Sequence, residues 1–159
     1  MRTGIGLGRT SVLAIAVAGL LAPALAADSA FSGLAGSWGG SGNIKYTDGT
    51  TERMRCSARY SGGASDVSMS INCASDAHNI DLSGRLHANG GHVSGSWSES
   101  NFGLSGSATG KASAGHLALG LGGGVSGSMS VSYSGTHQDV AITVAGAALD
   151  SVNMSLAKR

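Results

Sequence analysis

Apolar and polar residues alternate with a period of two along most of this chain. In one run, Val67, Met69, Ile71 and Cys73 are separated by single serine or asparagine residues. Because successive side chains of a strand point to opposite faces, this pattern predicts strands with one buried and one solvated face. Similar runs occur at 80–87, 93–98, 125–133, 140–144 and 152–156. We therefore expect an all-β protein.

Glycine is frequent, with 27 residues in 159, and several glycines fall on positions that alternation places on the inward face. Examples are Gly84, Gly95, Gly106 and Gly127. Inward glycines allow strands to bend and coil tightly. About eight to ten short strands joined by tight turns predict an antiparallel up-and-down meander closed into a small barrel, because closure removes exposed edges. A two-sheet β-sandwich is the alternative.

A hairpin is expected at Asn89–Gly90, because this pair suits a two-residue type I′ turn. That turn pairs Leu82 with Trp97 and sets His87 opposite His92 on the outer face. Two facing imidazoles can both reach one Zn²⁺ or Cu²⁺. A catalytic zinc site usually has three protein ligands, however, and no third lies nearby. His87 and His92 are thus weak metal candidates, a solvated turn is the alternative, and no cofactor is expected.

Exactly two cysteines occur, Cys56 and Cys73, and alternation places both on inward faces of consecutive strands. A four-residue loop between these strands sets the two cysteines opposite one another, which predicts a disulfide in an exported protein. A second turn, Thr47–Gly49 with Gly49 in a left-handed conformation, pairs Trp38 with Ala58.

Residues 1–26 are typical of a signal peptide. Arg2 and Arg9 precede a short apolar run, and Ala24–Ala26 has the small-x-small form that signal peptidase cleaves. The run is shorter than the roughly 20 residues that cross a bilayer, and no cysteine near the cut offers a site for a lipid anchor. We expect cleavage after Ala26, one barrel domain over 27–159, and a periplasmic or secreted location.

The charge and motif content exclude several function classes. Without Arg2 and Arg9, eight basic residues face nine acidic ones, which gives no footprint for nucleic-acid binding. No Gly-x-Ser-x-Gly elbow occurs, and the glycine run at 120–124 precedes no helix, so an enzyme is not expected. The outward residues are mostly polar and only seven residues are aromatic, which argues against a membrane-spanning barrel.

The interior is the candidate ligand site, because inward glycines leave volume that few large side chains can fill. Glu99 shares the inward face of Trp97, and a buried carboxylate is costly unless it is paired. It is either the polar contact of a ligand or a rim residue that caps a loop. We expect a small apolar or amphipathic ligand, with Glu99 and six further residues as the lining: Trp38, Met69, Ile71, Trp97, Met129 and Tyr133.

The segment FSGLAGSW, with Gly36 and Trp38, resembles the start of the calycin barrels, which are the lipocalins and avidins. In lipocalins an arginine from the last strand packs over this tryptophan, and Arg159 is the candidate here. The whole chain after the leader also resembles an uncharacterised family of secreted alphaproteobacterial proteins. That resemblance rests on the Gly-x-Trp start, the two cysteines, the segment GSWSE and the apolar C-terminal strand, and it implies a fold without an activity.

The Gly-x-Trp start and the cysteine pair also resemble the periplasmic metalloprotease inhibitors, which are small barrels that insert an N-terminal trunk into a protease. That resemblance implies a protein-binding role for Ala27–Ala30. A structural envelope protein without a ligand is a further alternative.

Overall fold

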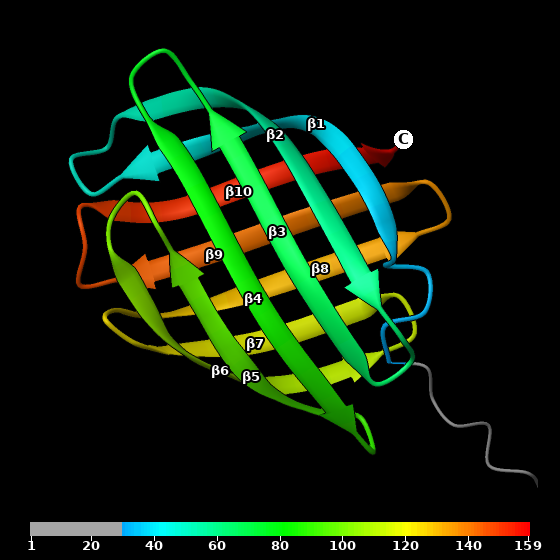
Figure 1. Cartoon of the computed structure of the whole chain (residues 1–159). Helices are drawn as coiled ribbons and strands as arrows, with labels where there is room; N and C mark the ends of the chain where they lie inside the picture. Colours follow the sequence, from blue (N-terminus) through cyan, green and yellow to red (C-terminus); the bar gives the residue numbers. More distant parts are fainter. Residues whose placement is uncertain (1–29) are drawn as a thin grey trace, which may run out of the picture.

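The computed structural model describes residues 30–159 (Figure 1). The predicted signal peptide lies outside these residues. Ten antiparallel strands follow one another in a meander, and β1 pairs with β10 to close the barrel. The strands are β1 (Gly36–Tyr46), β2 (Thr51–Gly62), β3 (Asp66–Ala74), β4 (Asn79–Asn89), β5 (His92–Glu99), β6 (Leu104–Ser113), β7 (His116–Gly123), β8 (Ser126–Ser134), β9 (His137–Ala145) and β10 (Leu149–Lys158). The predicted barrel is confirmed, and the sandwich alternative is not found.

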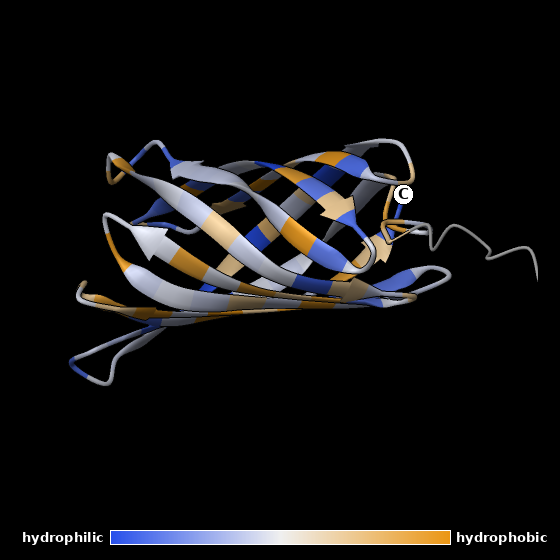
Figure 2. Ribbon diagram, turned by 90° about the horizontal axis from the view of Figure 1, so that it is seen from below, coloured by the Kyte–Doolittle hydropathy of each residue, from blue (hydrophilic) through white to orange (hydrophobic). Residues whose placement is uncertain are grey.

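Alternation decides which side chains enter the barrel. Along β4 every second residue from Ile80 to Ala88 is buried, and the residues between them are exposed. The same period runs through β3 and β10, so the buried side chains of strands far apart in the sequence all point into the barrel interior. Figure 2 shows the result as alternating hydrophobic and hydrophilic bands along the ribbons. Within residues 30–159, no helix has the length and hydropathy needed to cross a membrane.

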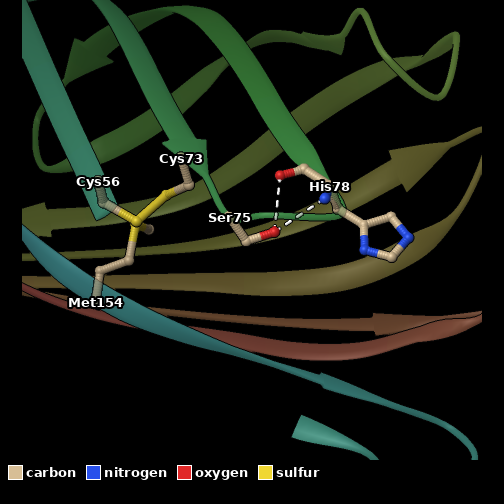
Figure 3. Close-up of a disulfide and its surroundings, with 5 residues drawn as sticks. All are labelled: Cys56, Cys73, Ser75, His78 and Met154. Atoms are coloured by element: carbon tan, nitrogen blue, oxygen red, sulfur yellow. Dashed lines mark hydrogen bonds between the residues drawn. A yellow bond between two sulfur atoms is a disulfide. The ribbon is translucent and has the colours of Figure 1, made fainter. Parts of the chain in front are cut away.

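The register of the first strands follows the predicted turns. Trp38 pairs with Ala58 across β1 and β2, and Gly49 has a positive φ of 88° in the connecting turn. Cys56 pairs with Cys73 across β2 and β3, and the two form the predicted disulfide. Figure 3 shows the bridge inside the wall with Met154 of β10 beside it; the sulfur atoms of Met154 and Cys73 lie 3.4 Å apart.

The predicted hairpin between β4 and β5 is wrong: its turn lies one residue later along the chain, which shifts the pairing register by two residues. The turn residues are Gly90 and Gly91, with φ of 57° and 80°, and Asn89 pairs with His92 as the last bridge. Trp97 consequently lies opposite Gly84 rather than Leu82. A shift of two residues preserves which side chains point inward, so alternation alone cannot detect it. The tryptophan still covers Gly106 of β6, as the inward pattern predicts.

One end of the barrel is closed by the segment that precedes β1. Phe31 and Leu34 are buried there, and two ring groups fix the segment by hydrogen bonds. The indole nitrogen of Trp38 donates to the carbonyl of Leu34 at 2.9 Å, and the Tyr133 hydroxyl donates to the carbonyl of Ala30 at 3.1 Å. In Figure 1 this blue segment lies at the right, together with the C-terminus. We call this the closed end.

A cation from the last strand packs over Trp38, but it is not the one expected. The Lys158 amino group lies 5.1 Å from the centre of a Trp38 ring. Arg159 instead places its guanidinium against Gly39, where an added side chain would collide with it. The cation–π contact with Trp38 at the closed end is therefore made by Lys158, the residue before the expected Arg159.

Candidate functional site

The opposite end of the barrel carries an apolar cavity, and we call it the open end. In a meander, alternate turns lie at the same end, so the β1–β2, β3–β4, β5–β6, β7–β8 and β9–β10 connections surround this opening. In Figure 1 these connections lie on the left, opposite the N-terminal segment. The open end is thus formed by five connecting loops and the strand ends beside them.

The cavity has a volume of about 390 Å³. That lies toward the lower end of the range for small-molecule sites, roughly 300–1,000 Å³. Most of its lining is aliphatic or aromatic, and three residues bring polar groups to it. The lining residues are Tyr46, His78, Ile80, Leu82, Trp97, Glu99, Phe102, Leu104, Leu121, Val125, Ile142, Val144, Ala147, Ala148, Leu149 and Val152.

Phe102 marks the mouth of this cavity. It belongs to the β5–β6 loop and is 51% exposed, and it is the one large apolar side chain of residues 30–159 that is exposed. A single exposed apolar residue is ordinary on a protein surface. Here the phenyl ring also lines a concave apolar site, so its exposure adds apolar surface to the entrance.

Glu99, at the end of β5, is buried and lines the cavity. One carboxylate oxygen accepts from the backbone N–H of Asp81 at 2.7 Å, and also from the side-chain amide of Asn101 at 3.4 Å. The other accepts from the backbone N–H of Phe102 at 2.6 Å. These bonds tie the β5–β6 loop to β4. Glu99 therefore holds a loop, which is one of the two roles expected for it, and it also lines the cavity. It pairs with Leu82 across the ladder.

A second polar group lies at the rim of the open end. The Tyr46 hydroxyl donates to Glu52 Oε2 at 2.9 Å, and His78 Nδ1 lies 2.9 Å from the same carboxylate oxygen. The hydroxyl of Ser75 and the imidazole of His78 lower the pKa of Glu52 to about 2. Burial and the neighbouring Glu52 raise the pKa of Tyr46 to about 12. At neutral pH the cluster therefore holds an ionised carboxylate and a protonated phenol.

The tautomer of His78 follows from these contacts. His78 Nδ1 lies 2.9 Å from both the Glu52 carboxylate and the Tyr46 hydroxyl, and an ionised carboxylate only accepts, so the tautomer with a proton on Nδ1 suits the contact with Glu52. Figure 3 shows how the turn holds this residue: the Ser75 hydroxyl accepts from the backbone N–H of His78 and donates to its carbonyl. These bonds hold the backbone of His78, and its imidazole contacts Tyr46 and Glu52 at the cavity rim.

The structure brings two of the seven predicted lining residues to this cavity, Trp97 and Glu99. The other five are buried but lie elsewhere. Trp38 and Tyr133 hold the N-terminal segment at the closed end, and Met69, Ile71 and Met129 belong to the packed core. Met69, for example, fills the space over Gly84. The middle of the barrel is thus filled by side chains, and the mostly apolar cavity lies at the open end.

The histidine pair proposed for metal binding is not assembled. His87 pairs with Ser94 in the ladder, and its Nδ1 lies 2.8 Å from an Asp66 oxygen, whereas His92 pairs with Asn89. Within residues 30–159 no group of three or more histidine, cysteine or acidic residues is arranged to hold a metal ion. The two histidines do not face one another, because the β4–β5 register differs by two residues from the predicted one.

The proposed protease-binding trunk, Ala27–Ala30, begins in the part of the chain that is not described. Its last residue, Ala30, is buried, and so is Phe31 beyond it. The chain is therefore already packed against the barrel from Ala30 onward. A trunk that enters a protease would have to precede this residue.

Sequence reasoning missed most of the cavity wall, although a signal for it exists. Ile80, Leu104, Val125 and Leu149 are apolar residues next to turns. Because the turns of a meander alternate between two ends, the residues beside every second turn share one end. Numbering the predicted turns along the chain and taking every second one would thus have placed these four side chains at the same end of the barrel.

Comparison with known proteins supports the fold. No protein-family model matches the chain, and no curated protein matches it. Among solved structures it is similar to Rv2717c from M. tuberculosis, with a TM-score of 0.67 and 20% sequence identity over 87% of this chain and 99% of that one. It also matches a redesigned β-barrel with a TM-score of 0.45 and 13% identity, over 79% of this chain and 91% of that one. The first likeness agrees with the closed barrel described above.

Proposed function

We propose that this protein is an exported, non-enzymatic barrel that binds one small apolar or amphipathic molecule at its open end. The observation that carries the proposal is the 390 Å³ cavity, whose wall is mostly aliphatic and aromatic and whose polar groups are few. Sites for small molecules have this composition, with apolar walls for affinity and a few polar groups for orientation. The ligand would enter past Phe102.

The disulfide supports export. Bridges such as Cys56–Cys73 form and persist in oxidising compartments and are rare in the cytosol. A periplasmic or secreted location agrees with the signal-peptide pattern at the start of the sequence. A carrier or sensor of apolar molecules in such a compartment needs no catalytic group.

The two tryptophans allow a direct test, because they lie at opposite ends. Trp97 lines the cavity, whereas Trp38 is buried at the closed end. A brominated octanol, which quenches indole on contact, should quench the Trp38→Phe variant, where only Trp97 remains. It should leave the Trp97→Phe variant nearly unchanged. Equal quenching of the two variants, or quenching of neither, would contradict binding at the open end.

A second variant pair tests the position by filling the cavity. Val144 of β9 lines the cavity, and Ala141 of the same strand is exposed on the outer face. Val144→Phe should weaken octanol binding about tenfold or more, which corresponds to ~1.4 kcal/mol. Ala141→Phe adds a ring outside the barrel and should leave the affinity unchanged. Isothermal calorimetry measures both.

A further inference from the structure

Glu99 is a buried carboxylate that forms no ion pair with any of residues 30–159. Only 7% of the residue is exposed, and its oxygens contact two backbone N–H groups and one side-chain amide. The ion pairs found in residues 30–159 involve Glu52, Asp66, Asp139 and Asp150, but not Glu99. Buried charges in proteins are normally paired with an opposite charge. The missing charge is therefore the unusual feature of this cavity.

We propose that the ligand of the cavity carries a cationic amine, and that Glu99 is its counter-ion. This inference rests on the proposed function and names the chemical class of the molecule. The apolar part of the ligand fills the space between the strand ends, and its ammonium group lies against the carboxylate. Glu99 thus has a binding role in addition to its contacts with the β5–β6 loop.

The hydrogen bonds of Glu99 leave room for such a partner. All of its contacts come from donors, which fits an ionised carboxylate, since that group only accepts. Oε2 accepts one hydrogen bond, from Phe102, although a carboxylate oxygen has two lone pairs. An ammonium group has three donors and can use the remaining position.

The charges around the open end favour the same class of ligand. Besides Glu99, the loops and strand ends at this end carry four carboxylates: Asp48, Glu52, Asp76 and Asp150. Two cationic side chains lie near them. Lys45 is 3.8 Å from Asp150, and Arg53 is exposed on the outer face of β2. A concave site with an excess of one charge raises the local concentration of ions of the opposite sign.

Aromatic residues add a further contribution. Tyr46, Trp97 and Phe102 line the cavity, and aromatic faces attract ammonium groups more strongly when water is excluded. An anionic amphiphile meets the opposite situation. Its carboxylate would approach Glu99 in a low-dielectric environment, where like charges repel strongly. The structure therefore distinguishes cationic from anionic ligands of the same size.

The test compares three molecules that share one apolar chain: octylammonium, octanol and octanoate. Binding to the full-length mature protein is measured by calorimetry at neutral pH. We expect octylammonium to bind about tenfold more tightly than octanol, and octanoate to bind more weakly than octanol. In Glu99→Gln, octylammonium affinity should fall to the level of octanol, while octanol affinity stays within about twofold of the wild type.

Asp81→Asn is the matched control, because it removes the same charge from β4 beside Glu99 but on the outer face. It should keep the preference for octylammonium. If octanol binds and octylammonium binds no better, the charge inference is overturned and the proposed function stands. The same holds if Glu99→Gln keeps the preference. If none of the three molecules binds to the wild type, the proposed function itself is wrong. The wild-type series remains decisive even if Glu99→Gln does not fold.

Discussion

Inward glycines bring neighbouring strands close together rather than leaving open space. A side chain at Gly95 would collide with the carbonyl oxygen of Arg85, and one at Gly106 would collide with that of Gly122. Trp97, the ladder partner of Gly106, uses this proximity, since its indole nitrogen lies 3.2 Å from the Gly122 oxygen and 3.1 Å from that of Ser107. Glycine is therefore needed at these positions for close approach of the backbone.

Replacing one such glycine should be costly. Gly95→Ala should lower the free energy of unfolding by at least about 2 kcal/mol, because the added methyl group forces the backbone of β4 away. Gly120→Ala is the control, since the nearest atom to its added methyl group is 3.7 Å away. It should change stability by less than about 0.5 kcal/mol. Urea unfolding measures both, and equal effects would contradict the argument.

A second prediction concerns the acid limb of stability. The folded-state pKa of Glu52 is about 2, below its ordinary value of 4.5. The ionised carboxylate thus stabilises the fold above the ordinary value, and this contribution is lost as the pH falls from 4.5 toward 2. Glu52→Gln should therefore flatten the pH dependence of unfolding in this window. Asp76→Asn, an exposed neighbour at the same end, should leave it as steep as in the wild type.

At the scale of elements, the segment before β1 acts as a plug for the closed end. Phe31→Ala should lower the free energy of unfolding by about 3–5 kcal/mol, because the ring is buried there. Ser32→Ala, an exposed change in the same segment, should have an effect below about 0.5 kcal/mol. Thermal denaturation distinguishes the two. A small effect of Phe31→Ala would show that the plug contributes little to the core.

The disulfide joins adjacent strands, so it constrains a short loop of the unfolded chain. The cysteines are 17 residues apart. A loop of that size should contribute about 3 kcal/mol by restricting the unfolded state. The double variant Cys56→Ala/Cys73→Ala should lose about this amount in urea unfolding while keeping the far-UV spectrum of the barrel. Unfolding of the variant in buffer alone would mean that the bridge contributes more.

The strands themselves were predicted better than the register between two of them, β4 and β5. Turn chemistry located the loop at Gly49, and the two cysteines fixed β2 against β3. Between β4 and β5 two turns compete, Asn89–Gly90 and Gly90–Gly91, and both keep the same residues inward. The choice between them depends on how His92 and Asn89 pair at the end of the ladder, which no short-range pattern determines. The predicted facing of His87 and His92 was wrong for the same reason.

At the scale of the whole molecule, closure depends on pairing between the first and last strands. Asn43 of β1 lies opposite Asn153 of β10, and both are exposed on the outer face. Asn43→Cys/Asn153→Cys should therefore form a second disulfide on oxidation. Because that bridge closes a loop of about 100 residues, it should add up to about 4.7 kcal/mol. Asn43→Cys/Ser155→Cys is displaced by two residues and should cross-link poorly, as a thiol assay would show.

The sequence predicted the barrel because alternation reports which way each side chain points. It predicted only Trp97 and Glu99 of the cavity because alternation does not report how far along the barrel axis a residue lies. Met69 and Ile142 have the same inward pattern, yet one belongs to the packed middle and the other to the cavity wall. Whether such a residue lines the cavity depends on how near it lies to the open end, and the closed end is filled by the segment before β1.

The segment that closes one end of the barrel also limits how a ligand could reach and leave the cavity. Phe31 and Leu34 are buried at the closed end, and Phe102 lines the cavity at the other end. A ligand that enters past Phe102 would therefore have to leave through the same entrance. A cavity of about 390 Å³ leaves no room for two ligand molecules to pass one another. Under the proposed function, one molecule must therefore leave before another can enter, and we expect its residence time to depend on the five loops around the entrance.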